Sequence, residues 1–190
     1  GTLSARVFAR GAHAASFGRL RIGAQARARD ADVFFGRDEE ILEARFALRE
    51  QAKQGCAFLL LTGASGSGKS SLARAGLLPM LQQRYAELGY EIAVIENWQP
   101  GSSPLRTLQN VLYQLGWTTQ ELQDDIILNS PKTIVESLRV HTPPNKRNLV
   151  VIDQFEELFS LSNYLERDSV FAVLANLPPV DETRTQFIAT

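Results

Sequence analysis

Three features of the sequence predict a three-layer α/β fold with a parallel sheet. Apolar runs of strand length alternate with segments whose apolar residues recur at helical spacing. The run at 149–153 is apolar up to its final residue, which is typical of a strand covered on both faces. A glycine-rich loop separates the run at 57–62 from a following helix. Strands joined through helices in this way form parallel sheets with helices on both faces.

The first helix is predicted at residues 38–54. Asp38 is suited to cap it, acidic side chains occupy its first turn, and apolar residues recur on one face. A second helix begins near Lys69, after the glycine-rich loop. We expect Gly76 and Pro79 to interrupt it, because both residue types disfavour a helix interior. A largely apolar strand follows at 90–96.

Three helices are predicted next, because three separate start signals appear. Ser103–Pro104 begins the first, and Thr118 with Glu121 forms a capping box for the second. Ser130–Pro131 begins the third, which ends before Pro143.

The strand at 149–153, a helix at about 168–177 and a strand at 186–190 complete the fold. The chain begins at Gly1 without an initiator methionine and stops inside the last predicted strand. We therefore expect an excerpt of a longer protein, with the α/β domain truncated at its C-terminus.

Length and composition predict one domain with a tail. The chain has 190 residues, of which 44% are hydrophobic, enough for one α/β core. Its net charge of −1 gives no general attraction to nucleic acid or acidic membranes. Cys56 is the only cysteine, and with His13 and His141 it forms no metal-ligand cluster. No apolar stretch approaches the roughly 20 residues of a membrane span, so we expect a soluble, cytoplasmic protein.

Residues 1–30 differ in composition from 31–190, the segment that we expect to form the domain. Six arginines and no acidic residue occur before residue 30, so all 21 acidic residues lie from that position onward. This pattern is compatible with an arm that binds an anion, with a transit peptide, or with a linker from an upstream domain. We favour a linker or tail.

Residues 63–71 read GASGSGKSS and match the phosphate-loop or Walker A motif, G-x-x-x-x-G-K-[ST]. Glycines let the backbone form a concave nest whose N–H groups bind phosphate oxygens, and the N-terminus of the following helix favours anions. We expect Lys69 to reach the β- and γ-phosphates of a nucleoside triphosphate and Ser70 to ligate Mg²⁺. The predicted nucleotide-binding residues of the loop are Gly63, Ala64, Ser65, Gly66, Ser67, Gly68, Lys69, Ser70 and Ser71.

A Walker B segment is predicted at the end of the strand at 149–153. Asp153 follows four apolar residues, and at the C-terminal tip of a parallel strand a carboxylate can hold Mg²⁺ through water. Hydrolysis also needs a group that activates or orients water, which Glu156 or Glu157 could supply alongside Lys69. Adjacent acidic residues after a strand are also typical of a solvated helix start.

The same part of the sequence favours adenine over guanine. Ras-type GTPases follow the metal-binding Asp with x-x-Gly and read guanine with Asn-Lys-x-Asp, whereas this chain has DQFE at 153–156 and NKRN at 145–148. Many AAA+ motors place Glu directly after the metal-binding Asp. Gln154 stands there, which disfavours a standard motor.

Four blocks together resemble the STAND class, the signal-transduction ATPases with numerous domains, and most closely its bacterial "novel STAND" branch. The blocks are FFGRDEEI at 34–41, GASGSGKSSL and RAGLLP within 63–79, WQPG and SPL within 98–105, and VIDQFEELF at 151–159. The resemblance implies a P-loop NTPase domain of the ASCE or AAA+-like kind. It also implies that ATP and ADP states switch a multidomain protein, with slow hydrolysis as the reset.

The resemblance further implies roles for single residues. Phe35, Gly36 and Arg37 would line the adenine side, although Arg37 is equally suited to a salt bridge at the helix start. Glu156 would act in water activation. The polar sensor at the tip of the last strand would be Thr190 or lie just past it.

The implied partners are the nucleotide, further domains of the same chain such as a helical domain and WD-type or other repeats, and a nucleotide-dependent oligomer. No nucleic acid or membrane partner is expected. Two other functions are compatible with the motifs. The fold could hold nucleotide as a scaffold without useful turnover, or act as a P-loop phosphotransferase, which would need an Arg-rich lid and an acceptor pocket that we do not find in the sequence.

Overall fold

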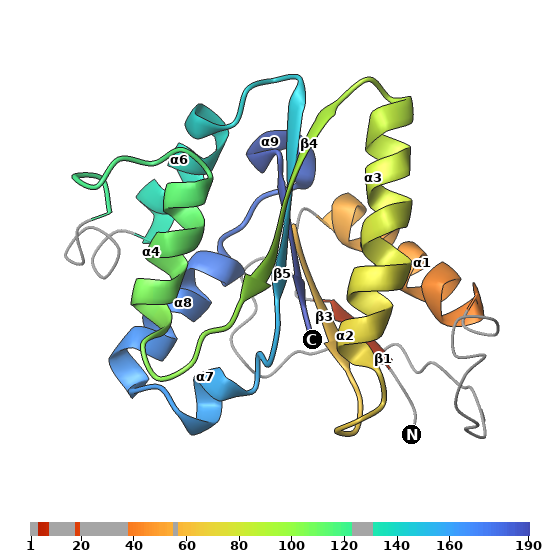
Figure 1. The fold of residues 1–190 in the computed structure, drawn as a ribbon, viewed down its shortest axis with the longest axis horizontal. Coiled ribbons are helices and arrows are strands. Elements are labelled where there is room, and N and C mark those ends of the chain that lie inside the picture. The colour runs from red at the N-terminus through yellow and green to blue at the C-terminus, as the bar shows by residue number, and fades with distance from the viewer. Residues whose placement is uncertain (1–3, 8–17, 20–37, 55–56, 123–130) are drawn as a thin grey trace.

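The computed structural model describes residues 4–7, 18–19, 38–54, 57–122 and 131–190. In these residues a six-stranded sheet has the order β2-β1-β3-β6-β5-β4, with helices on both faces (Figure 1). Four of its strands are parallel: β3 (Phe58–Thr62), β6 (Thr185–Ala189), β5 (Lys146–Ile152) and β4 (Glu91–Trp98). The predicted parallel sheet is therefore confirmed, and β6 lies between the strand of the phosphate loop and the strand that leads to Asp153.

Two short strands extend the sheet beside β3. β1 (Ser4–Val7) pairs antiparallel with β3, and β2 (Gly18–Arg19) pairs antiparallel with β1. Both strands belong to the segment 1–30, for which we expected a linker or tail. The described part of that segment thus forms the edge of the sheet.

Helices cover the two faces of the sheet as separate layers (Figure 1). One layer contains α1 (Asp38–Gln54) and α3 (Leu78–Glu87). The other contains α4 (Pro104–Gln114), α6 (Pro131–His141) and α8 (Tyr164–Ala175). The short helices α7 (Glu157–Ser160) and α9 (Val180–Thr183) precede and follow α8 in the chain.

The predicted interruption of the second helix is wrong. α2 (Lys69–Ser71), the π-helical segment η1 (Leu72–Leu77) and α3 follow one another without a gap. Gly76 serves packing instead, because a Cβ at this position would lie 3.0 Å from Cγ1 of Ile41 in α1. Pro79 lies in the first turn of α3, directly after the π-helical segment, where its missing N–H is tolerated.

The structure also describes the residues at two other predicted helix starts, near Thr118 and near Asp168. The backbone N–H of Thr118 donates to Oε2 of Glu121 at 2.8 Å, so the predicted capping contact forms, but residues 123–130 lie outside the described residues. α8 begins four residues before the predicted Asp168, because the side chain of Asn163 caps it by accepting from the N–H of Glu166 at 2.9 Å.

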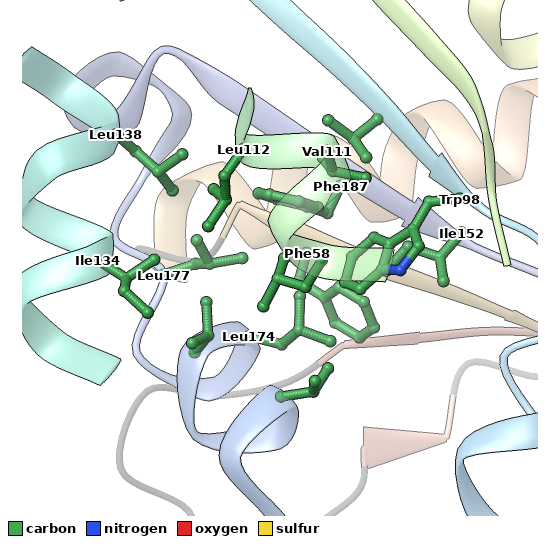
Figure 2. Close-up of a cluster of buried hydrophobic side chains, with 14 of the residues drawn as sticks. Phe58, Trp98, Val111, Leu112, Ile134, Leu138, Ile152, Leu174, Leu177 and Phe187 are labelled. Atoms are coloured by element: carbon green, nitrogen blue, oxygen red, sulfur yellow. The ribbon is translucent and has the colours of Figure 1, made fainter. Parts of the chain in front are cut away.

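Most of the largest buried side chains lie between the sheet and α4, α6 and α8 (Figure 2), and a second cluster lies on the side of α1 and α3. Trp98 at the end of β4 meets Phe187 of β6 edge to face, with ring centroids 6.3 Å apart. The indole N–H of Trp98 donates to Oγ1 of Thr107 in α4 at 3.0 Å, which satisfies the polar atom of this buried ring. The core therefore anchors the C-terminal end of β4, beside the strand end that carries Asp153.

Candidate nucleotide-binding site

The phosphate loop joins β3 to the helix that begins with α2. Gly66 and Gly68 have φ of 74° and 81°, the left-handed conformation that glycine adopts at little cost. The ammonium of Lys69 donates to the carbonyl oxygens of Gly63 and Ala64 at 3.2 and 3.3 Å. The loop is thus a tight turn that holds a cation beside its own backbone.

Asp153 follows β5 and faces this helix. Its Oδ1 accepts hydrogen bonds from the Ser70 hydroxyl at 2.7 Å, the Thr190 hydroxyl at 2.9 Å and the Gln154 N–H at 3.1 Å. Its Oδ2 accepts from the Arg74 guanidinium at 2.7 Å. Since β6 lies between β3 and β5, the residue that follows it, Thr190, stands between the two Walker motifs. The structure therefore brings Ser70, Asp153 and Thr190 together.

The carboxyl of Asp153 is nearly buried, and this burial raises its pKa. The hydrogen bonds from Ser70 and Thr190, the positive charge of Arg74 and the Gln154 N–H lower it, and together they hold the pKa of Asp153 below its ordinary value. Asp153 is therefore a carboxylate at neutral pH.

A cavity of about 410 Å³ lies between the phosphate loop and Asp153. Its lining combines loop backbone, an ammonium, hydroxyls and carboxylates. The lining includes Ser65, Gly66, Gly68, Lys69, Ser70, Ser71, Asp153, Gln154, Glu156 and Thr190. Such a set can bind phosphate on one wall and a hard cation on the other.

The two glutamates after Asp153 have different surroundings. Glu156 is exposed and lines the cavity. The carboxylate of Glu157 accepts from the Gly101 N–H at 3.0 Å and so fastens the loop between β4 and α4. The sequence left both open as the group that activates water, and of the two only Glu156 is among the residues that line this cavity.

The model of the Novel STAND NTPase 1 family matches residues 24–190, most of the chain. The chain belongs to this family. The resemblance to the novel STAND branch, and with it the nature of the chain as a nucleotide-binding NTPase module, is confirmed. A comparison with curated proteins found no match.

A solved structure of the Aeropyrum pernix ORC2 protein, as ADPNP–ADP complexes, resembles this Novel STAND NTPase 1 chain with a TM-score of 0.51. The two chains are 21% identical, and the likeness covers 82% of this chain and 40% of that chain. At this identity the likeness shows a shared fold, and the predicted AAA+-like P-loop NTPase fold is confirmed. The chain therefore spans about two fifths of the length of this neighbour.

Three predicted site residues of this family member, Phe35, Gly36 and Arg37, lie outside the described residues. Their assignment to the adenine side therefore stays a prediction. The predicted loop residues Gly63–Ser71 and Asp153 are all described, and most of them line the cavity.

Sequence reasoning missed Arg74 and Gln154 as parts of the site. Arg74 follows Ser70 by four residues, so the helical repeat places both on one helix face, a signal that the sequence contains. Gln154 has a φ of 54°, which is uncommon for a residue other than glycine. No pattern in the sequence predicts that backbone conformation, which accompanies the bond from its N–H to Asp153.

Among the residues that the structure describes, no group of three or more His, Cys, Asp or Glu is arranged to hold a metal ion. Magnesium sites that also use phosphate oxygens need only one or two protein carboxylates. In the same part of the chain, no helix has the length and apolarity to cross a membrane.

Proposed function

We propose that this chain is the ATP-binding and slowly hydrolysing switch module of a multidomain signalling NTPase. The observation that carries the proposal is the hydrogen bond from Ser70 to Asp153 at 2.7 Å. These residues come from the two Walker motifs and are 83 positions apart in the sequence. Both residues line the cavity that the phosphate loop also lines.

The proposed ligand is ATP or ADP. Loop N–H groups and Lys69 would bind the phosphates. Adenine is supported by the sequence, which contains no Asn-Lys-x-Asp segment of the kind that reads guanine, and by the ORC2 protein, which was solved as ADPNP–ADP complexes. From the family resemblance we assign Phe35, Gly36 and Arg37 to the adenine side.

The donor atoms at the site fit Mg²⁺. The Ser70 hydroxyl and the Asp153 carboxylate are hard oxygen ligands, and their oxygens lie 2.7 Å apart at the edge of the cavity. Ser70 would bind the ion directly and Asp153 through water. When bound, Mg²⁺ neutralises charge on the β- and γ-phosphates.

Glu156 is the residue that we assign to orienting or activating the attacking water. It shares the cavity with Lys69 and Ser70, and its exposed carboxylate has access to solvent water. Lys69 would stabilise charge that develops on the γ-phosphate. In this assignment Asp153 holds the metal ion and Glu156 orients or activates the attacking water.

ATP binding and phosphate release by the purified protein test the proposal. Glu156→Gln keeps the size of the side chain and removes the base, so we expect retained ATP affinity with phosphate release lost. Glu157→Gln is the matched control, because the adjacent carboxylate bonds Gly101. Wild-type protein that binds ATP without releasing phosphate would instead be a scaffold, and transfer to an acceptor other than water would indicate a phosphotransferase.

We also propose that residues 31–190 form the main part of the NTPase domain of a cytoplasmic protein, to whose sheet the preceding segment adds β1 and β2 at one edge. Its partners would be further domains of the same protein, helical or built from repeats, and other copies in a nucleotide-dependent oligomer. Light scattering of the protein with ADP and with a non-hydrolysable ATP analogue tests the oligomer. An equal mass in both states would contradict this part of the proposal.

A further inference from the structure

Arg74 lies on the helix that follows the phosphate loop and contacts Asp153 and β4. Its Nη2 donates to Oδ2 of Asp153 at 2.7 Å and to the backbone carbonyl of Glu96 in β4 at 3.3 Å. One guanidinium group therefore ties together the helix after the phosphate loop, the edge strand β4 and the end of β5. Its side chain is 35% exposed, whereas that of Asp153 is 10% exposed.

The partners of Asp153 are divided between its two oxygens. Ser70 and Thr190 bind Oδ1, and Arg74 binds Oδ2. A carboxylate held by a cation at one oxygen cannot rotate freely about its Cβ–Cγ bond. The other oxygen is therefore held towards Ser70.

We propose that Arg74 is a positioning residue that orients the Asp153 carboxylate for Mg²⁺. This inference rests on the proposed function, because it assigns Arg74 a part in metal-dependent ATP binding. Arg74 acts through Asp153 and does not itself contact the metal or the phosphates. Partners that orient a metal-binding group in this way typically alter metal affinity by about 10- to 100-fold when they are removed.

Arginine suits this place for a geometric reason. Nη2 carries two N–H groups, and the contacts give one to the carboxylate and one to the Glu96 carbonyl. A lysine ammonium would keep the charge but lacks the planar, rigid arrangement of donors. Arg74→Lys should therefore retain part of the effect, and Arg74→Gln little of it.

The test is isothermal titration of ATP into the protein, once in EDTA and once in Mg²⁺. For wild type we expect a gain in affinity on adding Mg²⁺. In Arg74→Gln that gain should fall about tenfold while the affinity in EDTA stays within about twofold of wild type. Arg74→Lys should lie in between. Arg84→Gln, an exposed arginine of α3, is the matched control and should keep the full gain.

The outcomes separate the two proposals. Wild type that binds no ATP in either buffer would overturn the proposed function and this inference with it. If wild type gains ATP affinity on adding Mg²⁺ and Arg74→Gln shows the same gain, the role of Arg74 alone is overturned. A larger gain in Arg74→Gln would overturn it too, because it would mean that the guanidinium competes with the metal. Thermal unfolding checks each variant, and if Arg74→Gln does not fold, an unchanged gain in Arg74→Lys still contradicts the proposal.

Discussion

The hydroxyl of Thr190 donates to Oδ1 of Asp153 at 2.9 Å, and its oxygen lies 3.3 Å from the hydroxyl of Ser70. The two Walker motifs therefore meet at one threonine, which the order of the sheet brings between them. Any change in the position of this side chain should affect the metal-binding aspartate directly.

Thr190→Val should weaken ATP hydrolysis more than ATP binding. Valine keeps the shape of threonine and removes the hydroxyl, so Asp153 loses one of its partners while the loop stays intact. The free energy of unfolding should fall by about 1 kcal/mol. Phosphate release, ATP titration and urea unfolding measure the three effects.

Thr185→Val is the control for this experiment. Thr185 is buried at the start of β6, the strand that Thr190 follows, and its hydroxyl accepts from Nδ2 of Asn148. The Thr185→Val variant should lose a similar free energy of unfolding and hydrolyse ATP at the wild-type rate. Equal losses of hydrolysis in both variants would show that Thr190 acts through stability alone.

Glu157→Ala should destabilise the protein without changing its affinity for ATP. The variant leaves the Gly101 N–H without its carboxylate partner, which should cost about 1 kcal/mol. Glu156→Ala is the control and should leave the free energy of unfolding nearly unchanged, because Glu156 is exposed. Urea unfolding measures the free energy of unfolding of both variants. A larger loss in Glu156→Ala than in Glu157→Ala would contradict a structural role for Glu157 and an exposed, non-structural position for Glu156.

Gly76→Val should destabilise the packing of α1 on the helix after the phosphate loop. A Cβ at position 76 would already lie 3.0 Å from Ile41, and the valine methyl groups need more room. We expect a loss of about 1–3 kcal/mol in the free energy of unfolding. Adding Ile41→Ala should restore part of it, whereas strictly additive losses in the double variant would contradict a contact between these residues.

ATP should bind more tightly than GTP. The sequence contains no Asn-Lys-x-Asp segment, the motif that reads guanine in Ras-type GTPases. NKRN at 145–148 ends at Asn148, which is buried near the start of β5, at the other end of the strand from Asp153, and bonds Thr142 and Thr185. Competition between the two nucleotides for a fluorescent ATP analogue measures the preference, and stronger competition by GTP would refute the assignment of adenine.

Much of the fold was predictable because local signals and burial agree. The strand at 57–62, the run before Asp153 and the amphipathic helix at 38–54 carry patterns that tertiary contacts reinforce. Gly76 misled the prediction, because its role comes from a contact with Ile41, which lies 35 positions earlier in the sequence. No local pattern reports such a contact.

The candidate site was predictable to the extent that its motifs are contiguous. Ser70 and Asp153 stand in recognisable segments, whereas the division of work between Glu156 and Glu157 depends on the loop at Gly101. Arg74 was not predicted as a site residue because its partner, Asp153, is distant in the sequence. The contact with Asp153 exists only once β5 lies beside β4 and the helix.

Titration of ATP and of AMP into wild type and Lys69→Ala in Mg²⁺ tests most directly whether the loop at 63–71 binds the phosphates. Lys69→Ala should lower the affinity for ATP by about 10- to 100-fold, because a charge-assisted contact to the β- and γ-phosphates is lost, and should change AMP binding little. Lys132→Ala, an exposed lysine of α6, should leave both affinities unchanged. Unchanged ATP affinity in Lys69→Ala would contradict the account.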